Sequence, residues 1–262
     1  MLTYDFMLRA FAASGIVALV AGTVGYFLVL RGQTFAGHAL SHVGFAGATG
    51  GALAGIAPLW GVLAVTLAAG LAMGLIGERL SGRDVATGIV LALALAFGLL
   101  FLSLNTSTTL QATTVLFGNV LAVSPSMLVA LALLGVATLA ALAVVARPLL
   151  FASLQPELAE AKGVSLRLVA TLFMAIVALA VAQSVQIVGI LLVFTLMVGP
   201  PAAAQLLVGR LVPGILLSAA LAVAQAWLGI AVAYHTDWPT SFCITILSAV
   251  VYFAALILRG RE

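Results

Sequence analysis

The sequence predicts an all-α, polytopic bundle of about eight or nine membrane-spanning helices, and two observations support that prediction. The 262-residue chain is 65% hydrophobic and only 6% charged, whereas a soluble domain carries about 25% charged residues. Apolar runs of about 20 residues recur along the chain, which is the length that an α-helix needs to cross a bilayer. Continuous runs exclude a β-barrel, whose strands alternate apolar and polar residues. We therefore treat residues 1–262 as one transmembrane domain.

Nine stretches have this length, and basic residues orient them. The weakest division lies at the polar residues 182–186, so an eight-span alternative stays open. Lys and Arg favour the cytoplasmic ends of spans. With the amino terminus outside and the carboxyl terminus in the cytoplasm, only Arg9 of the ten basic residues falls outside. The predicted spans are 10–30, 36–56, 59–78, 84–103, 126–146, 168–187, 189–208, 212–234 and 239–258.

Two connecting stretches are too polar to cross. Residues 104–125 fall on the outer side and contain one apolar segment, which predicts a short helix lying on the membrane surface or dipping into it. Residues 147–167 fall in the cytoplasm and hold five of the chain's seventeen charged residues.

The cytoplasmic stretch predicts a helix of about two turns. Pro156 fits the first turn, Glu157 fits the amino-terminal end, and Gly163 fits the exit. A helix this short needs a surface to pack on. Leu158 and Ala161 share a face that suits docking to a partner chain, and the alternative is an ordinary connecting helix that packs on its own chain.

Two histidines within an apolar stretch are the first candidate functional residues. His38 and His42 are four residues apart, so they share one helix face. At a rise of ~1.5 Å per residue from Arg31, His42 lies about 16 Å inside the membrane, near its midplane. Ionisable groups there are costly and usually mark a transport path, and imidazole suits divalent transition metals. The alternative is a structural hydrogen bond to a neighbouring helix carbonyl.

His235 and Asp237 form a second candidate pair, at the outer end of a helical hairpin. An imidazole and a carboxylate can bind a metal ion that enters or is held there. Asp237 followed by Trp238 and Pro239 also fits the start of the next helix, with Asp237 as its cap. One carboxylate oxygen can cap while the other binds, so both interpretations stay open.

Gly199, Pro200 and Pro201 interrupt the seventh predicted span. Each proline removes a backbone donor and clashes with the preceding turn, so we expect the helix to break inside the membrane. Carbonyls freed at that depth need protein or a cavity around them. The segment is therefore a candidate hinge or pathway lining, or a simple kink.

Several function classes are excluded by missing motifs. The sequence contains no GxxxxGK[ST], HExxH or GxSxG pattern, so it lacks a P-loop and the usual zinc-protease and serine-hydrolase signatures. Cys243 is the only cysteine, which excludes a cysteine-based metal cluster. The basic residues are scattered and predict no nucleic-acid surface.

Five segments in this order resemble the membrane-spanning permease subunit of bacterial ABC importers for zinc and manganese. They are LRGQTFAGHALSHVGFAGA (30–48), LFGNVLAVS (116–124), PELAEAKGV (156–164), VGILLVFTLMVGPPAAA (188–204) and the Asp-x-Pro of 237–239.

The resemblance implies a homodimer in the bacterial plasma membrane, driven by two cytoplasmic ATPase subunits and fed by an extracytoplasmic metal-binding protein. It implies no permanently bound cofactor, because the divalent metal is the transported substrate. It also assigns residues 149–165 to the ATPase contact, including Gln155, Pro156, Glu157, Leu158, Ala161 and Gly163.

The chain departs from this family's pattern at two positions that concern the ion. Many members have aspartate where this chain has His38, followed by the histidine retained here as His42. Nitrogen in place of a carboxylate favours zinc over manganese. Many zinc-type members also have a histidine in the span that begins here at Asp84, where this chain has Ala92.

The sequence therefore predicts a transport subunit, not an enzyme, that carries zinc first and manganese or iron second by alternating access. We expect His42 and Asp237, and then His38 and His235, to bind the ion in succession, since a complete cage would release it too slowly. Two alternatives stay open. One is a permease for metal chelates or cobalamin, and the other is an intramembrane enzyme or an ATPase-independent secondary transporter whose histidines carry protons.

Overall fold

Long helices form nearly all of the described structure. The computed structural model describes residues 4–76, 83–104, 118 and 120–260. Within these ranges each predicted span overlaps one helix of 18 residues or more, so the all-α bundle is confirmed. The helices are α1 (Asp5–Leu30), α2 (Thr34–Leu53), α3 (Pro58–Ile76), α4 (Arg83–Leu104), α6 (Pro125–Leu154), α8 (Leu166–Val188), α9 (Ile190–Leu207), α10 (Leu211–Thr236) and α11 (Thr240–Arg259).

Seven helices of the described chain are long and apolar enough to cross a membrane. The two others of span length are α2, which contains histidine, glycine and hydroxyl side chains, and α9, whose apolar part is shorter. Both lie among other helices: α2 packs against α3, α4, α8 and α9, and α9 packs against α1, α10 and α11. α2, the least apolar of these helices, is therefore inside the bundle, where its polar groups avoid lipid.

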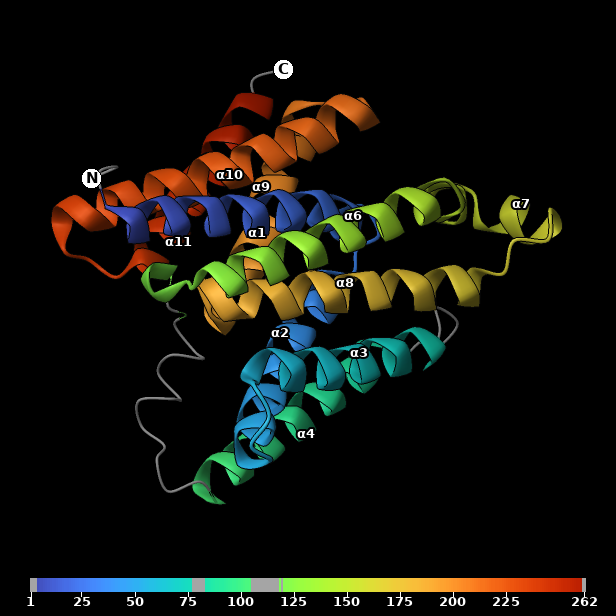
Figure 1. The fold of residues 1–262 in the computed structure, drawn as a ribbon. Coiled ribbons are helices and arrows are strands. Elements are labelled where there is room, and N and C mark those ends of the chain that lie inside the picture. Colours follow the sequence, from blue (N-terminus) through green and yellow to red (C-terminus); the bar gives the residue numbers. More distant parts are fainter. Residues whose placement is uncertain (1–3, 77–82, 105–117, 119, 261–262) are drawn as a thin grey trace.

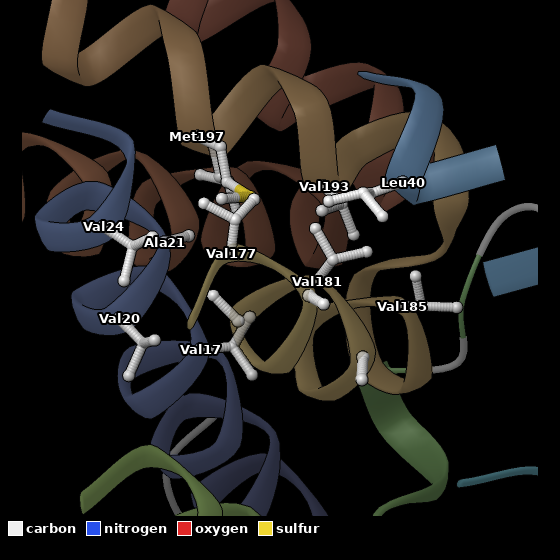
Figure 2. Close-up of a cluster of buried hydrophobic side chains, with 14 of the residues drawn as sticks. Val17, Val20, Ala21, Val24, Leu40, Val177, Val181, Val185, Val193 and Met197 are labelled. Carbon is white, nitrogen blue, oxygen red and sulfur yellow. The ribbon is translucent and has the colours of Figure 1, made fainter. Parts of the chain in front are cut away.

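The core lies where α1, α8 and α9 meet α2. In Figure 1, α1, α6 and α8 form a middle layer, with α2–α4 on one side and α9–α11 on the other. Figure 2 shows buried side chains from four helices pointing toward one another, mostly branched residues with few rotamers. They include Val17, Val20, Ala21 and Val24 of α1, Leu40 of α2, Val177, Val181 and Val185 of α8, and Val193 and Met197 of α9.

α6 is longer than the predicted span 126–146. Ser124 caps its start by accepting a hydrogen bond from the Met127 amide at 3.2 Å, and the helix continues through Pro148 to Leu154. Its 30 residues extend ~45 Å, beyond the ~30 Å hydrocarbon core. Arg147 and Pro148 do not end α6. They lie in its last turns, beyond the length that the hydrocarbon core requires. The extension places the short helix α7 (Pro156–Ala161) at the opposite end of the bundle from the α10–α11 connection (Figure 1).

α8 and α9 divide at Gly189, which confirms the boundary between the predicted spans 168–187 and 189–208 to within a residue. Gly189 has φ 78° and ψ 163°, a region that is essentially restricted to glycine. Gln183 and Ser184 stay inside α8 and are fully buried. The polar residues therefore indicated a boundary correctly, but the backbone freedom of one glycine sets its position.

The described part of the outer segment 104–125 packs onto this break. A Cβ on Gly118 would lie 2.5 Å from the Gly189 nitrogen, so the two backbones touch. η1 (Val120–Ala122) is a single 3-10 turn against α1, with Val120 buried. The predicted surface helix falls on the apolar segment 116–123, of which residues 116, 117 and 119 lie outside the described residues, and the described remainder is helical only in the turn Val120–Ala122.

The predicted break at Gly199, Pro200 and Pro201 is wrong, because α9 is continuous through both prolines. Neighbouring helices cover the segment. A Cβ on Gly199 would overlap the Ser248 hydroxyl of α11, so the two helices are in close contact there. Proline is tolerated in a membrane helix where surrounding protein covers the backbone that it leaves unpaired.

α1 provides that cover on the other side of α9. Pro201 cannot donate to the carbonyl of Met197, four residues earlier. That oxygen faces Gly25 of α1, and a Cβ on Gly25 would overlap it. Gln205 Nε2 also donates to the Tyr26 carbonyl at 2.8 Å. The absence of a side chain at Gly25 therefore lets α1 cover the freed carbonyl.

We expect Gly25→Ala to lower the free energy of unfolding by about 1–3 kcal/mol, because the added methyl forces the α1 and α9 backbones apart. Gly88→Ala in α4 is the matched control: nothing lies within 4 Å of a Cβ at Gly88, so the substitution is expected to be neutral or slightly stabilising. Thermal melting in detergent measures both. Equal melting temperatures for the two variants would contradict the proposed contact.

Candidate metal-binding site

The two intramembrane histidines lie side by side on one face of α2, as predicted. The ring centroids of His38 and His42 are 4.7 Å apart, and the rings are nearly perpendicular. Both side chains are half-buried. Leu40, between them in sequence, is fully buried in the core, and at 3.6 residues per turn it points roughly to the opposite side of α2. Its burial sets the rotation of α2 and so directs both imidazoles to one face.

Phe194 of α9 lies beside His38. Its ring centroid lies 4.9 Å from that of His38, in an edge-on arrangement. His38 Nδ1 is buried without a hydrogen-bond partner among the described residues. A buried nitrogen without a partner is costly, so the structural alternative, a histidine held by a helix carbonyl through this nitrogen, is not what the geometry shows. The role of Phe194 had no signal in the sequence beyond an aromatic residue in an apolar run.

The small residues around the histidines serve helix packing. Ser41 is buried and its hydroxyl donates to the Gly37 carbonyl at 3.0 Å, so it is engaged within α2. A Cβ on Gly47 would lie 2.6 Å from the Gly61 carbonyl oxygen of α3. Glycine therefore brings α3 against α2, and the pair of imidazoles stays on a separate face.

The second candidate pair, His235 and Asp237, lies at the carboxyl-terminal end of α10. His235 is in the last turn of α10, where it is exposed and its ring centroid lies 5.3 Å from that of Tyr234. Asp237 is the C-cap of α10, with a left-handed φ of 56°, a conformation that Asp tolerates better than most residues. The capping interpretation is wrong: the N-cap of α11 is Pro239, without a side-chain cap bond. Asp237 ends one helix instead of starting the next.

The four predicted ligands do not meet in one protomer. Among the described residues there is no group of three or more His, Cys, Asp or Glu side chains placed to hold a metal ion. His42 is eleven residues from the carboxyl-terminal end of α2, which corresponds to ~16 Å of helix. The two pairs are therefore separate, one within the bundle and one at the exposed end of α10.

The short helix between α6 and α8 has the predicted form. α7 begins at Pro156, and Gly163, with φ 82°, follows it. Ala159 is fully buried against the chain, whereas Leu158 is 46% exposed and Ala161 is exposed. One face of α7 therefore packs on its own protomer and the other is open. Gln155 and Glu157 are exposed beside it.

A bundle of apolar helices with a half-buried imidazole pair inside it and a short exposed helix at one end defines a polytopic membrane transport protein. The model of the ABC 3 transport family matches residues 3–259. The chain belongs to this family and is an integral membrane permease component.

Characterised relatives match over almost the whole chain. The manganese transport system membrane protein MntC of Listeria innocua is 27% identical over 263 residues, which is 100% of this chain and 94% of that protein. The manganese import system permease protein ScaB of Streptococcus parasanguinis is 29% identical, covering 99% of this chain and 92% of that protein. The solved structure of PsaBC from Streptococcus pneumoniae in complex with Fab has a TM-score of 0.86 at 26% identity, over 96% of this chain and 91% of that chain. The permease resemblance and the fold class predicted from the sequence are confirmed.

Proposed function

We propose that this chain is the membrane path of an ATP-driven importer of divalent metal ions. The observation that carries the proposal is the pair His38 and His42, which share one face of an inner helix while His38 Nδ1 lacks a partner. Two imidazoles at this depth are hard to account for as packing groups, and they are suitable ligands for a transition-metal dication.

The pair is an incomplete site, which suits transport. Two nitrogens from one chain leave at least two positions of a tetrahedral ion unfilled. A second copy with its α2 facing the first would supply two more nitrogens, so we propose a homodimer with the ion path between the copies. An ion held by few and exchangeable ligands leaves more readily than one in a closed structural site.

The ligand chemistry favours zinc as the ion. Imidazole nitrogen suits zinc, whereas manganese prefers carboxylate and water oxygen. The names of the relatives favour manganese as the second candidate, since MntC and ScaB are named as manganese transporters. Direct competition between the two ions distinguishes these candidates, and iron is the third ion to include.

The outer pair provides a first contact for the ion. With the amino terminus outside, His235 and Asp237 face the extracytoplasmic side, where a solute-binding protein would release its metal. Both side chains are exposed, so they can receive an ion without a change in the fold. His42 and His38 would then bind it deeper in the bundle, in succession.

α9 is the element that we expect to move during this transfer. Pro201 leaves the Met197 carbonyl without a helical donor, and that carbonyl packs against Gly25 of α1. A helix with missing internal bonds bends at lower cost there. The hinge at Gly199, Pro200 and Pro201 would thus act within a helix that is continuous in this conformation, and Phe194 would move relative to His38.

The exposed face of α7 is the proposed contact for the ATPase. We expect Leu158→Asp to weaken copurification of the ATPase roughly tenfold or more, because a charge replaces an apolar anchor at the centre of the contact. Leu207→Asp is the matched control, since Leu207 ends α9 on the same predicted side and is 43% exposed, close to the 46% of Leu158. Equal loss in both variants would point to a general charge effect and contradict docking at α7.

The experiment that tests the proposed function is uptake in proteoliposomes. The chain is purified with its copurifying ATPase and supplied with the binding protein, and radiolabelled zinc, manganese and iron compete for entry with ATP on the ATPase side. ATP-dependent accumulation of a free ion supports the proposal. Accumulation only of a metal chelate favours the chelate alternative, and ion uptake driven by a proton gradient without ATP favours a secondary transporter.

A further inference from the structure

Arg31 lies where three helices meet at the α7 end of the bundle. It is the C-cap of α1, and its Nη1 donates to Ser153 Oγ of α6 at 2.7 Å. Its guanidinium carbon lies 5.7 Å from the centre of the Phe173 ring of α8, within the range of a cation–π contact. α6 leads into α7 and α8 leads out of it. Arg31 therefore touches both helices that hold α7.

Ser153 is the closer of these contacts to α7. It is three residues before Pro156, the first residue of α7. Its hydroxyl also donates to the Leu149 carbonyl one turn earlier, which fixes the orientation of the oxygen that Arg31 contacts. A displacement of α7 that turns the end of α6 would move this oxygen directly.

A rigid turn joins Arg31 to the helix that carries the histidines. Gln33 N donates to the Leu28 carbonyl at 2.9 Å and Gly32 N to the Val29 carbonyl at 3.0 Å, which are the two bonds of a Schellman motif. Gly32 has φ 63°, the left-handed conformation that this motif needs. α2 starts immediately afterwards at Thr34, so no flexible linker separates the two helices.

The same helix then carries the displacement to the histidines. His38 follows Thr34, the first residue of α2, by four residues and His42 by eight, which corresponds to ~6 and ~12 Å of helix. A shift of the Arg31 turn that moves the start of α2 therefore moves both imidazoles together.

We infer that Arg31 is a positioning residue that couples the movement of α7 to the His38–His42 pair. The inference rests on the proposed function, in which α7 receives force from the ATPase. Ser153 and Phe173 hold the guanidinium to the two helices beside α7, and the turn at Gly32 passes its movement into α2. Arg31 contacts no transported ion. Its role is to make ion release by the histidines depend on the nucleotide state of the partner.

The test measures the number of zinc ions transported per ATP hydrolysed by the full complex in proteoliposomes. In Arg31→Gln we expect this ratio to fall on the order of tenfold, a typical coupling between two sites, while hydrolysis continues. Ser153→Ala keeps the guanidinium and should lower the ratio a few-fold, and the double variant should be no worse than Arg31→Gln alone, because both changes remove one contact. Arg210→Gln is the matched control, an exposed arginine at the start of α10 on the same predicted side, and should keep the wild-type ratio.

Zinc binding and the melting temperature are measured on the same preparations, so that misfolding is separated from uncoupling. A wild-type ratio in Arg31→Gln overturns the inference, and so does a parallel loss of hydrolysis and uptake. If Arg31→Gln does not fold, the ratio in Ser153→Ala decides, with an unchanged value overturning the inference. If the wild-type complex accumulates no metal ion, the proposed function fails first, and the coupling role fails with it.

Discussion

Replacement of His42 by alanine is expected to reduce ATP-dependent uptake of free zinc by at least about 100-fold, the upper end of what even outer-shell substitutions cost at metal sites. His42 is the deeper member of the pair, and its ring lies 4.7 Å from that of His38. One imidazole per protomer would remain, or two of the four nitrogens in the proposed homodimer, which is too few to hold a desolvated dication at that depth. The loss should appear in uptake and in zinc binding alike, while the complex with the ATPase stays intact.

Ser41→Ala is the control for this variant. Ser41 is the neighbouring residue, buried, with its hydroxyl bonded to the Gly37 carbonyl of its own helix. Its substitution perturbs the same turn of α2 without removing a predicted ligand, so uptake should stay near wild type. If His42→Ala also leaves uptake near wild type, the histidines are not ligands. A chelate whose metal is already enclosed then becomes the better substrate.

The sequence predicted those parts of the fold that follow from hydrophobicity and helix periodicity. Each predicted span overlaps one long helix, and the four-residue spacing placed His38 and His42 on one face. The position of α7 followed from local signals, Pro156 at the start and Gly163 at the exit. These features depend on residues close together in the chain, so the sequence contains all that is needed to derive them.

The errors have a common physical cause, which is that contacts between helices decide the outcome. Pro200 and Pro201 would break an isolated helix, but α1 covers the freed Met197 carbonyl because Gly25 has no side chain. Nothing in the sequence near residue 200 indicates which glycine of α1 will lie opposite.

Local backbone conformation caused a second kind of error. The Asp237–Pro239 sequence fits a helix start, but Asp237 adopts a left-handed conformation that ends α10 instead. The boundary between α8 and α9, by contrast, was predicted to within a residue, and Gly189 sets it because its φ and ψ lie where other residues are strained. Both positions depend on where the chain must turn, and the hydrophobic pattern defines that only within a few residues.

The contacts of Arg31 could not have been foreseen at all. Its partner Ser153 is 122 residues away in sequence. The positive-inside rule treats Arg31 only as a charge at the cytoplasmic edge. The structure shows in addition that this charge joins the α1–α2 turn to the helices beside α7.

The substitution His38→Asp is expected to change which ion is preferred. A carboxylate oxygen would replace the imidazole nitrogen beside His42. Positions 38 and 42 would then hold the aspartate and histidine found in many of the zinc and manganese permeases that this chain resembles. Manganese prefers oxygen ligands such as carboxylate, whereas zinc is well suited to imidazole nitrogen. We expect the ratio of manganese to zinc uptake to rise on the order of tenfold, which corresponds to about 1.4 kcal/mol. Dual-isotope uptake under competition measures this ratio in a single sample.

His38→Asn separates the charge from the loss of the imidazole. Asparagine has nearly the shape of aspartate but no negative charge, so it binds either dication poorly, and uptake of both ions should fall together. The surroundings make this a clean comparison, because the Phe194 ring beside His38 contributes no competing ligand to either variant. An unchanged ion ratio in His38→Asp, with uptake retained, would mean that residue 38 does not touch the ion. The selectivity would then have to come from His42 together with groups on the second copy.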